Sequence, residues 1–140
     1  LFGGDRLALA HVGDSRAYLL RQGRLHSLTD DHSVVGELLR RHEISEADAA
    51  QHPHRHVLTR ALGTRPRTEP DLAEMTPQEG DVFIMCSDGL TGFVDDKEIT
   101  EHLMSEPDLE AAAAALVDTA NRAGGQDNIT VLLVRYEKEA

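Results

Sequence analysis

Short apolar runs separated by turn-forming residues dominate the first thirty positions of the chain. Residues 6–12, 16–21 and 24–28 are rich in apolar side chains, and Gly13-Asp14-Ser15 separates the first two runs. Runs of this length, joined by turns of two or three residues, are typical of β-strands in hairpins. We therefore predict an antiparallel meander of three strands in this segment, with Asp14 at an exposed turn.

Residues 81–86 form a more apolar run, in which apolar and polar residues alternate too little for a strand with one solvent-exposed face. It predicts a strand covered on both faces, and Asp88 and Gly89 follow it directly. Residues 129–134 form a similar run, which Asp127 precedes. The end of one strand lies beside the start of the next in an antiparallel pair, so pairing of these strands would bring Asp88 and Asp127 to one site.

Two helices are predicted in the C-terminal half, at residues 95–104 and 108–123. The second contains an alanine block with apolar side chains at helical spacing, and Gly124-Gly125 follows it. Alanine is the strongest helix former, and glycine is the usual residue after a helix end. Residues 69–74 include a proline and predict a strand at the edge of a sheet.

The segment between the N-terminal strands and the strand at residues 69–74, about residues 30–63, is predicted to form a flap over one edge of the sheet. It carries many charges and few large apolar groups, and Ser33 and Ser45 are plausible N-caps of short helices. The histidines at positions 52, 54 and 56 suggest zinc, but a proline interrupts them and no cysteine or spaced acidic partner completes a site. We interpret them as part of a solvated loop.

Composition limits the classes of function. The chain is one domain or part of one, and its net charge of -11 argues against a general nucleic-acid binder, which needs a basic face. Its single cysteine excludes an internal disulfide and is compatible with a reducing, cytoplasmic location. No run approaches the roughly 18 apolar residues of a membrane span, and no signal peptide is recognisable. The chain begins at Leu1 rather than Met, so we expect a fragment or a trimmed domain.

Asp88 and Asp127 are candidate ligands for a hard divalent cation. Each stands where a buried strand meets a loop, and Mg²⁺ and Mn²⁺ prefer oxygen ligands held with little freedom. For either residue alone, an ordinary turn at a strand end explains the sequence as well. The two residues together favour the metal site.

Two rival chemistries lack the residues that they require. A cysteine phosphatase needs an arginine six residues after its nucleophile, but position 92, six residues after Cys86, is glycine. We therefore interpret Cys86 as a buried strand thiol. An esterase built on Gly13-Asp14-Ser15 needs a late Asp-x-x-His to supply the base, and residue 99 before His102 is isoleucine. Ser15 is therefore interpreted as a turn residue.

Three motifs carry a resemblance to a known family over nearly the whole chain. In order and spacing they resemble the metal-dependent protein serine/threonine phosphatases of type 2C (PPM), and the form of the flap resembles the bacterial branch. Two shorter segments, 28–33 and 59–63, resemble the flap boundaries of that family. The motifs are Ala10-His11-Val12-Gly13-Asp14-Ser15-Arg16-Ala17-Tyr18, Cys86-Ser87-Asp88-Gly89-Leu90 and Gly125-Gln126-Asp127-Asn128-Ile129-Thr130.

The resemblance implies an α+β fold, an antiparallel β-sandwich with helices packed outside each sheet. It also implies a binuclear Mg²⁺/Mn²⁺ centre, with Asp88 and Asp127 as ligands and Asp14 serving an additional, weaker third ion. Asn128 would support Asp127, and residues 33–63 would meet the substrate. No catalytic residue beyond the metal ligands is implied for this chain. The implied reaction is hydrolysis of phosphoserine and phosphothreonine in proteins that a bacterial Ser/Thr kinase phosphorylates, with water activated by the two metals.

The resemblance covers only part of the family's domain. The family's first metal-binding motif, its phosphate-gripping arginine and a histidine proposed as general acid precede the Gly-Asp-Ser-Arg turn, and none has a counterpart here. We therefore expect residues 1–140 to be the C-terminal part of a catalytic domain, inactive alone. A non-catalytic binding or regulatory module derived from a phosphatase is the alternative.

Overall fold

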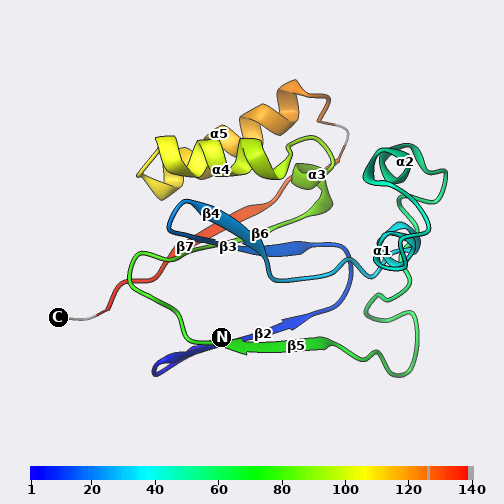
Figure 1. Cartoon of the computed structure of the whole chain (residues 1–140), viewed down its shortest axis with the longest axis horizontal. Coiled ribbons are helices and arrows are strands. Elements are labelled where there is room, and N and C mark those ends of the chain that lie inside the picture. Colours follow the sequence, from blue (N-terminus) through cyan, green and yellow to red (C-terminus); the bar gives the residue numbers. More distant parts are fainter. Residues whose placement is uncertain (126, 139–140) are drawn as a thin grey trace.

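Two antiparallel sheets stacked face to face form the centre of the molecule (Figure 1). The computed structural model describes residues 1–125 and 127–138. The smaller sheet has the order β1 (Phe2–Gly3), β2 (Arg6–His11) and β5 (Asp71–Met75). The larger sheet has the order β4 (Arg24–Ser27), β3 (Arg16–Arg21), β6 (Val82–Cys86) and β7 (Val131–Arg135). The predicted α+β sandwich is thereby confirmed.

The helices of the described residues lie in two places. Three of them, α3, α4 and α5, cover the outer face of the larger sheet, whereas α1 and α2 lie beside the sandwich (Figure 1). Over residues 1–125 and 127–138, no helix covers the outer face of the smaller sheet. The helices are α1 (Val34–Arg40), α2 (Glu46–Gln51), α3 (Asp88–Thr91), α4 (Asp96–Ser105) and α5 (Leu109–Arg122).

The predicted meander of the first thirty residues is wrong in one respect. β3 pairs with β4, but β2 pairs with β1 and β5 and belongs to the other sheet. The chain therefore changes sheets at Gly13-Asp14-Ser15 instead of forming a hairpin there. This crossing lets Leu7 of β2 and Leu19 of β3 face one another across the sandwich, where they form a core with Phe83. A flat meander would leave that apolar face of the sheet in water.

The larger core lies between the four-stranded sheet and its helices. Ile84 of β6 and Leu116 of α5 are completely buried there. The small side chains of Ala112 and Ala120 are also completely buried, which lets α5 lie close to the sheet. The cap predicted at Ser33 is present: its hydroxyl accepts a hydrogen bond from the Gly36 N–H at the start of α1.

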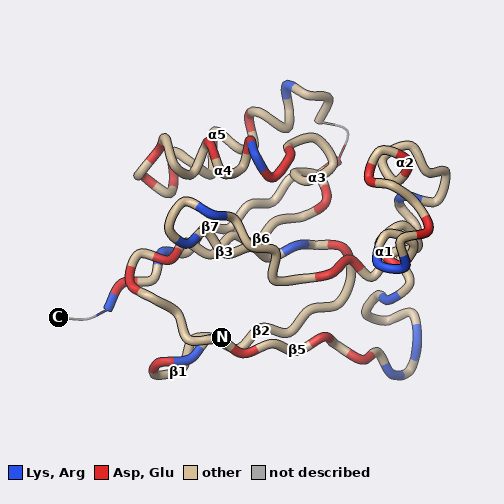
Figure 2. The backbone as a smooth tube through the Cα atoms, in the orientation of Figure 1, with Lys and Arg blue, Asp and Glu red and all other residues tan. Residues whose placement is uncertain are grey.

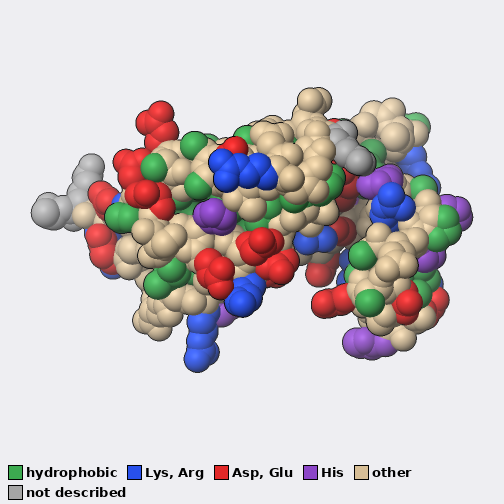
Figure 3. All heavy atoms as spheres, turned by 90° about the horizontal axis from the view of Figure 1, so that it is seen from above, with side chains coloured by type: hydrophobic (Ala, Val, Ile, Leu, Met, Phe, Trp, Pro, Cys, Tyr) green, Lys and Arg blue, Asp and Glu red, His purple; other side chains and the backbone are tan. Residues whose placement is uncertain are grey.

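The segment predicted as a flap forms a lobe beside the sandwich (Figure 3). Its two ends meet at an isolated bridge between Ser33 and Leu58, where the Val34 N–H donates to the Val57 carbonyl. In Figure 3 a groove separates this lobe from the sandwich, and acidic side chains lie at the groove. Among the described residues, no helix is both long and apolar enough to cross a membrane.

Candidate functional site

The two predicted metal-binding segments meet at one end of the larger sheet. β6 and β7 are antiparallel neighbours with Cys86 opposite Val131, which is the pairing that would bring Asp88 and Asp127 to one site. Beyond the strands, the Ser87 N–H donates to the Thr130 carbonyl at 3.1 Å. The Ser87 hydroxyl donates to the Asn128 carbonyl at 3.2 Å and accepts from the Thr130 N–H at 3.0 Å. This single side chain thus fastens the end of β6 to the segment that enters β7.

Gly89 completes this junction by close backbone contact. A Cβ atom added at Gly89 would overlap the carbonyl oxygen of Asn128, so only glycine fits without displacing the neighbouring chain. Asp88 and Asp127 each stand one residue from this contact. The structure therefore brings their backbones together at one rim of the sandwich, as strand pairing predicted.

The local structure at each aspartate differs from the sequence prediction. Asp88 is half-buried and is the first residue of the short helix α3, so the chain enters a helix there rather than a plain turn. β7 begins at Val131, which leaves Asp127 in the loop before the strand. Asp127 is exposed, and its Oδ1 accepts a hydrogen bond from the Asn128 N–H at 2.7 Å. Both carboxylates thus remain available to solvent and ions.

Asp14 lies at the crossing between the two sheets and belongs to the same acidic region. Its pKa is raised, first by burial and then by the negative charges of Asp88 and Asp31. Figure 2 shows acidic stretches of the chain at the end of the sandwich next to α3, on the side of α1 and α2. A bound cation would relieve the repulsion between the carboxylates, because opposite charge within a few ångströms favours their ionised form.

Asp31 was not among the candidates from sequence. Arg16 holds it in a two-pronged ion pair, with Nε–Oδ1 and Nη2–Oδ2 distances of 2.9 Å each. Nη1 of Arg16 also donates to the Tyr18 hydroxyl at 3.2 Å. Arg16 therefore fixes Asp31 beside Asp14 while compensating its charge.

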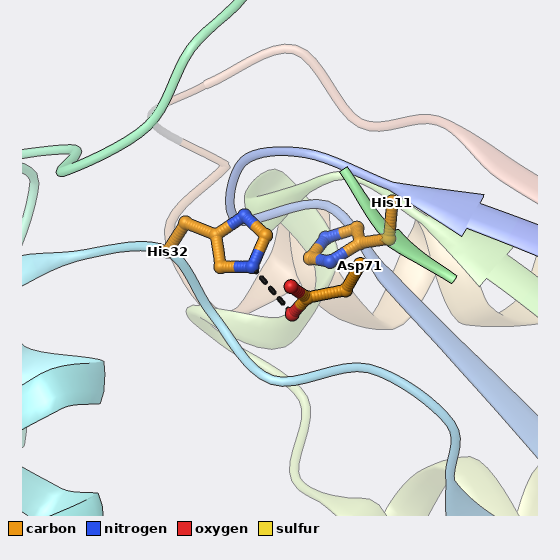
Figure 4. A group of neighbouring side chains, drawn as sticks. All are labelled: His11, His32 and Asp71. Atoms are coloured by element: carbon orange, nitrogen blue, oxygen red, sulfur yellow. Dashed lines mark hydrogen bonds and ion pairs between the residues drawn. The ribbon is translucent and has the colours of Figure 1, made fainter. Parts of the chain in front are cut away.

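A second group of side chains lies beside the Asp14 turn, where it bonds Gly13 and Ser15, and comes from three separate segments. His11, His32 and Asp71 offer one ligand atom each within 4.8 Å of one another (Figure 4). The described residues contain no other such group of three, so Asp14, Asp88 and Asp127 do not form one. Sequence reasoning missed this cluster, although Asp30-Asp31-His32-Ser33 is an unusually polar stretch between a strand and a helix.

Two further features, the Cys86 thiol and a depression along α4, do not belong to the candidate metal site. Cys86 is buried in β6, which confirms its interpretation as a buried strand thiol, and burial raises the pKa of the thiol to about 11. A surface depression of about 640 Å³ lies along α4, lined by Glu98, Glu101, His102, Met104 and Ser105. It shares no residue with the acidic region and has no counterpart in the predicted chemistry.

Comparisons with known proteins place the chain in one family. The family model described as Protein phosphatase 2C matches residues 1–129. The serine/threonine phosphatase stp of Listeria monocytogenes serotype 4b is 47% identical over 133 residues, which cover 95% of this chain and 53% of that protein. This chain thus spans about half the length of the curated relatives it matches.

Solved structures show the same similarity. The crystal structure of the Mycobacterium tuberculosis serine/threonine phosphatase PstP/Ppp superposes with a TM-score of 0.91 at 40% identity, covering 99% of this chain and 58% of that one. The catalytic domain of PstP in complex with two manganese ions superposes with a TM-score of 0.89 at 39% identity, covering 99% of this chain and 56% of that one.

Proposed function

Because the chain belongs to the protein phosphatase 2C family, we propose that residues 1–140 are the C-terminal part of a catalytic domain that hydrolyses phosphoserine and phosphothreonine in proteins. The observation that carries this proposal is the junction of Ser87 and Gly89 with Asn128, because it places two carboxylate-bearing segments at one rim. Residues of about 30–63 would form the flap beside that rim. Activity would require the part of the domain that relatives have before the Gly-Asp-Ser-Arg turn.

Asp88 and Asp127 are proposed as ligands of two divalent cations, Mn²⁺ or Mg²⁺, and Asp14 as a ligand of a third. The donor set fits hard cations, because it consists of carboxylate oxygens at a partly solvated rim. The raised pKa of Asp14, caused by burial and by Asp88 and Asp31, supports cation binding there. When bound, such ions activate water for attack on phosphorus and neutralise charge on the phosphoryl group.

The protein's own part of the mechanism is to position these carboxylates. Ser87 ties β6 to the loop of Asp127, and the Asn128 N–H orients the Asp127 carboxylate. The two hydrogen bonds from Arg16 fix the orientation of the Asp31 carboxylate, and the positive charge of Arg16 compensates the negative charge of Asp31 near Asp14. Positioning of this kind matters because phosphoryl transfer depends on alignment and charge stabilisation more than on a protein nucleophile.

The substrates proposed are phosphoproteins of a bacterial Ser/Thr kinase. Similarity to the Listeria serine/threonine phosphatase supports the chemical class of substrate. A cytoplasmic location is proposed because the single, buried thiol of Cys86 suits a reducing compartment. A non-catalytic module derived from a phosphatase is the second candidate.

The test is hydrolysis of a phosphothreonine peptide by the full-length protein with Mn²⁺, with and without EDTA. We expect activity only with the metal and a loss of at least about 100-fold in Asp88→Asn, because metal-derived charge stabilisation supplies several kcal/mol. Asp118→Asn is the matched control, because Asp118 is half exposed in an ion pair with Arg122 on α5. Activity that persists in EDTA would refute the metal mechanism, and absence of activity under all conditions would favour the non-catalytic module.

A further inference from the structure

His32 connects its own segment to three others although only 2% of it is exposed. Its backbone N–H donates to the Gly13 carbonyl at 2.8 Å, and its carbonyl accepts from the Thr59 N–H at 2.8 Å. Its ring accepts the Gly13 N–H at Nδ1, at 3.1 Å, and meets Asp71 Oδ2 through Nε2 at 2.7 Å (Figure 4). Every polar atom of this buried residue is therefore used: two bonds reach Gly13 in the Asp14 turn, one reaches Thr59 and one reaches Asp71.

The hydrogen bonds determine the tautomer of the His32 ring. Gly13 can only donate through its N–H, so Nδ1 carries the lone pair and Nε2 carries the proton that is donated to Asp71. A metal at Nε2 would require the opposite tautomer, with an Nδ1–H directed at the Gly13 N–H. The proximity of His11, His32 and Asp71 is therefore explained by a hydrogen-bond network rather than by a transition-metal site.

Asp71 links this network to the end of the flap. Its Oδ1 accepts from Arg60 Nη1 at 2.9 Å while its Oδ2 accepts from His32. Hydrogen bonds from His32 and then from Arg60 lower the pKa of Asp71, so the carboxylate is an obligate acceptor on both oxygens. Thr59, which binds the His32 carbonyl, precedes Arg60, so both connections reach the same end of the flap.

His11 holds the other side of the Asp14 turn. Its Nε2 lies 2.7 Å from the Ser15 carbonyl, which is an acceptor, so Nε2 is the protonated nitrogen. Its ring packs on His32 with a centroid distance of 4.8 Å, and its buried Nδ1 has no hydrogen-bond partner in the part of the chain that the structure describes. Asp14 is therefore bracketed: His32 holds Gly13 before it, and His11 holds Ser15 after it.

We propose that His11, His32 and Asp71 are positioning residues that hold the Asp14 turn toward Asp88 and couple it to the base of the flap. Among the described residues, no hydrogen bond or ion pair joins any of the three to Asp14, Asp88 or Asp127, so they act through Gly13, Ser15, Thr59 and Arg60. This inference rests on the proposed role of Asp14 as a ligand of a divalent cation. Loosening the turn lowers cation affinity, and loosening the Asp71 contacts frees the flap.

Two substitutions at His32 separate the two connections. His32→Asn keeps an acceptor near the Nδ1 position but does not reach Asp71, whereas His32→Gln places its amide near the Nε2 position and loses the Gly13 contact. Asp71→Asn should destabilise the fold less than the His32 substitutions, because the Asp71 side chain is 50% exposed. The asparagine has one acceptor oxygen, so it can accept a hydrogen bond from His32 or from Arg60 but not from both. Glu74→Gln is the matched control on the same strand, in an exposed ion pair with Arg6.

The experiment measures two properties of the full-length protein. One is Mn²⁺ binding, followed through the electron paramagnetic resonance signal of free Mn²⁺, and the other is the rate of protease cleavage between residues 41 and 57. His32→Gln should weaken the weakest Mn²⁺ site about tenfold or more, as loss of supporting hydrogen bonds does in metal sites, while kcat at saturating Mn²⁺ changes less. His32→Asn and Asp71→Asn should mainly speed flap cleavage. Glu74→Gln should match wild type in both measurements.

The outcomes separate this inference from the proposed function. Mn²⁺ binding and cleavage are measured without turnover, so they test the network even in a protein without phosphatase activity. Folded His32→Gln and Asp71→Asn variants with wild-type Mn²⁺ binding and cleavage would overturn the inference. Thermal stabilisation of the wild type by Zn²⁺ that His11→Phe abolishes would also overturn it, because the histidines would then be metal ligands.

Discussion

Replacement of Gly89 by alanine tests the junction on which the candidate site depends. The added Cβ would overlap the Asn128 carbonyl oxygen and lie 3.2 Å from Cγ1 of Ile129. The oxygen belongs to the backbone, so the loop that carries Asp127 must move away from β6. Overpacking of this kind costs about 1–3 kcal/mol of unfolding free energy. For a domain of 150–250 residues this lowers the Tm by about 2–4 °C per kcal/mol.

The effect on activity should exceed the effect on stability. Movement of the Asp127 loop by about 1 Å relative to Asp88 can cost about 100-fold in rate, because alignment contributes a large part of catalysis. Phosphopeptide hydrolysis by the full-length protein should therefore fall about 10- to 100-fold in Gly89→Ala at a temperature where the variant is folded. Mn²⁺ titration should show weaker binding.

Gly3→Ala is the control for this experiment. Gly3 lies in β1, and a Cβ there would meet no atom within 4 Å. The stability and activity of Gly3→Ala should therefore match those of the wild type, apart from a small effect of the lower conformational entropy of the unfolded chain. If Gly89→Ala retained both wild-type Tm and wild-type activity, the close approach of Gly89 and Asn128 would not control the site, and our reasoning about the rim would be wrong.

Three other predictions concern charge and burial. Arg21 lowers the pKa of Asp81, whose side chain is only 1% exposed, so the stability from this ion pair is complete above about pH 5 and is lost as the pH falls below about 4. Asp81→Asn should remove about 1.5–3 kcal/mol at pH 7 in urea unfolding and progressively less as the pH falls below about 4; a loss that does not change with pH would contradict this. The Cys86 thiol, with its pKa raised to about 11 by burial, should resist a thiol reagent at pH 8 until the protein unfolds, and rapid native labelling would show otherwise. Asp14→Asn should raise the Tm in EDTA, because it removes a carboxylate that Asp88 repels, and should reduce the Tm gain from Mn²⁺; a lower Tm in EDTA would contradict the repulsion.

Local chemistry in the sequence was sufficient for most elements of the fold. The apolar runs 81–86 and 129–134 predicted two strands, and β6 and β7 are these strands. They also pair in the antiparallel way that would bring Asp88 and Asp127 together. Ser33 and the alanine block predicted a capped helix and a close-packed helix, and α1 and α5 have these properties. These predictions succeeded because capping, periodicity and glycine breaks act within a few residues of one another.

The same local signals could not decide which sheet each strand joins. Gly13-Asp14-Ser15 is compatible with a hairpin and with a crossing between sheets, because both need a tight turn between apolar strands. The crossing was decided by burial of Leu7 and Leu19 against Phe83, which is more than sixty residues away from either. Only the packed sandwich makes that burial possible.

The sequence by itself was enough to nominate candidate ligands for divalent cations, because carboxylates beside glycines at strand ends can be recognised without coordinates. The tertiary structure alone decided what surrounds them. His32 meets Asp71 across 39 positions, and Arg21 meets Asp81 across 60. Such partners are chosen by the close packing of distant segments, since a buried polar group must find its hydrogen bond wherever the fold supplies one.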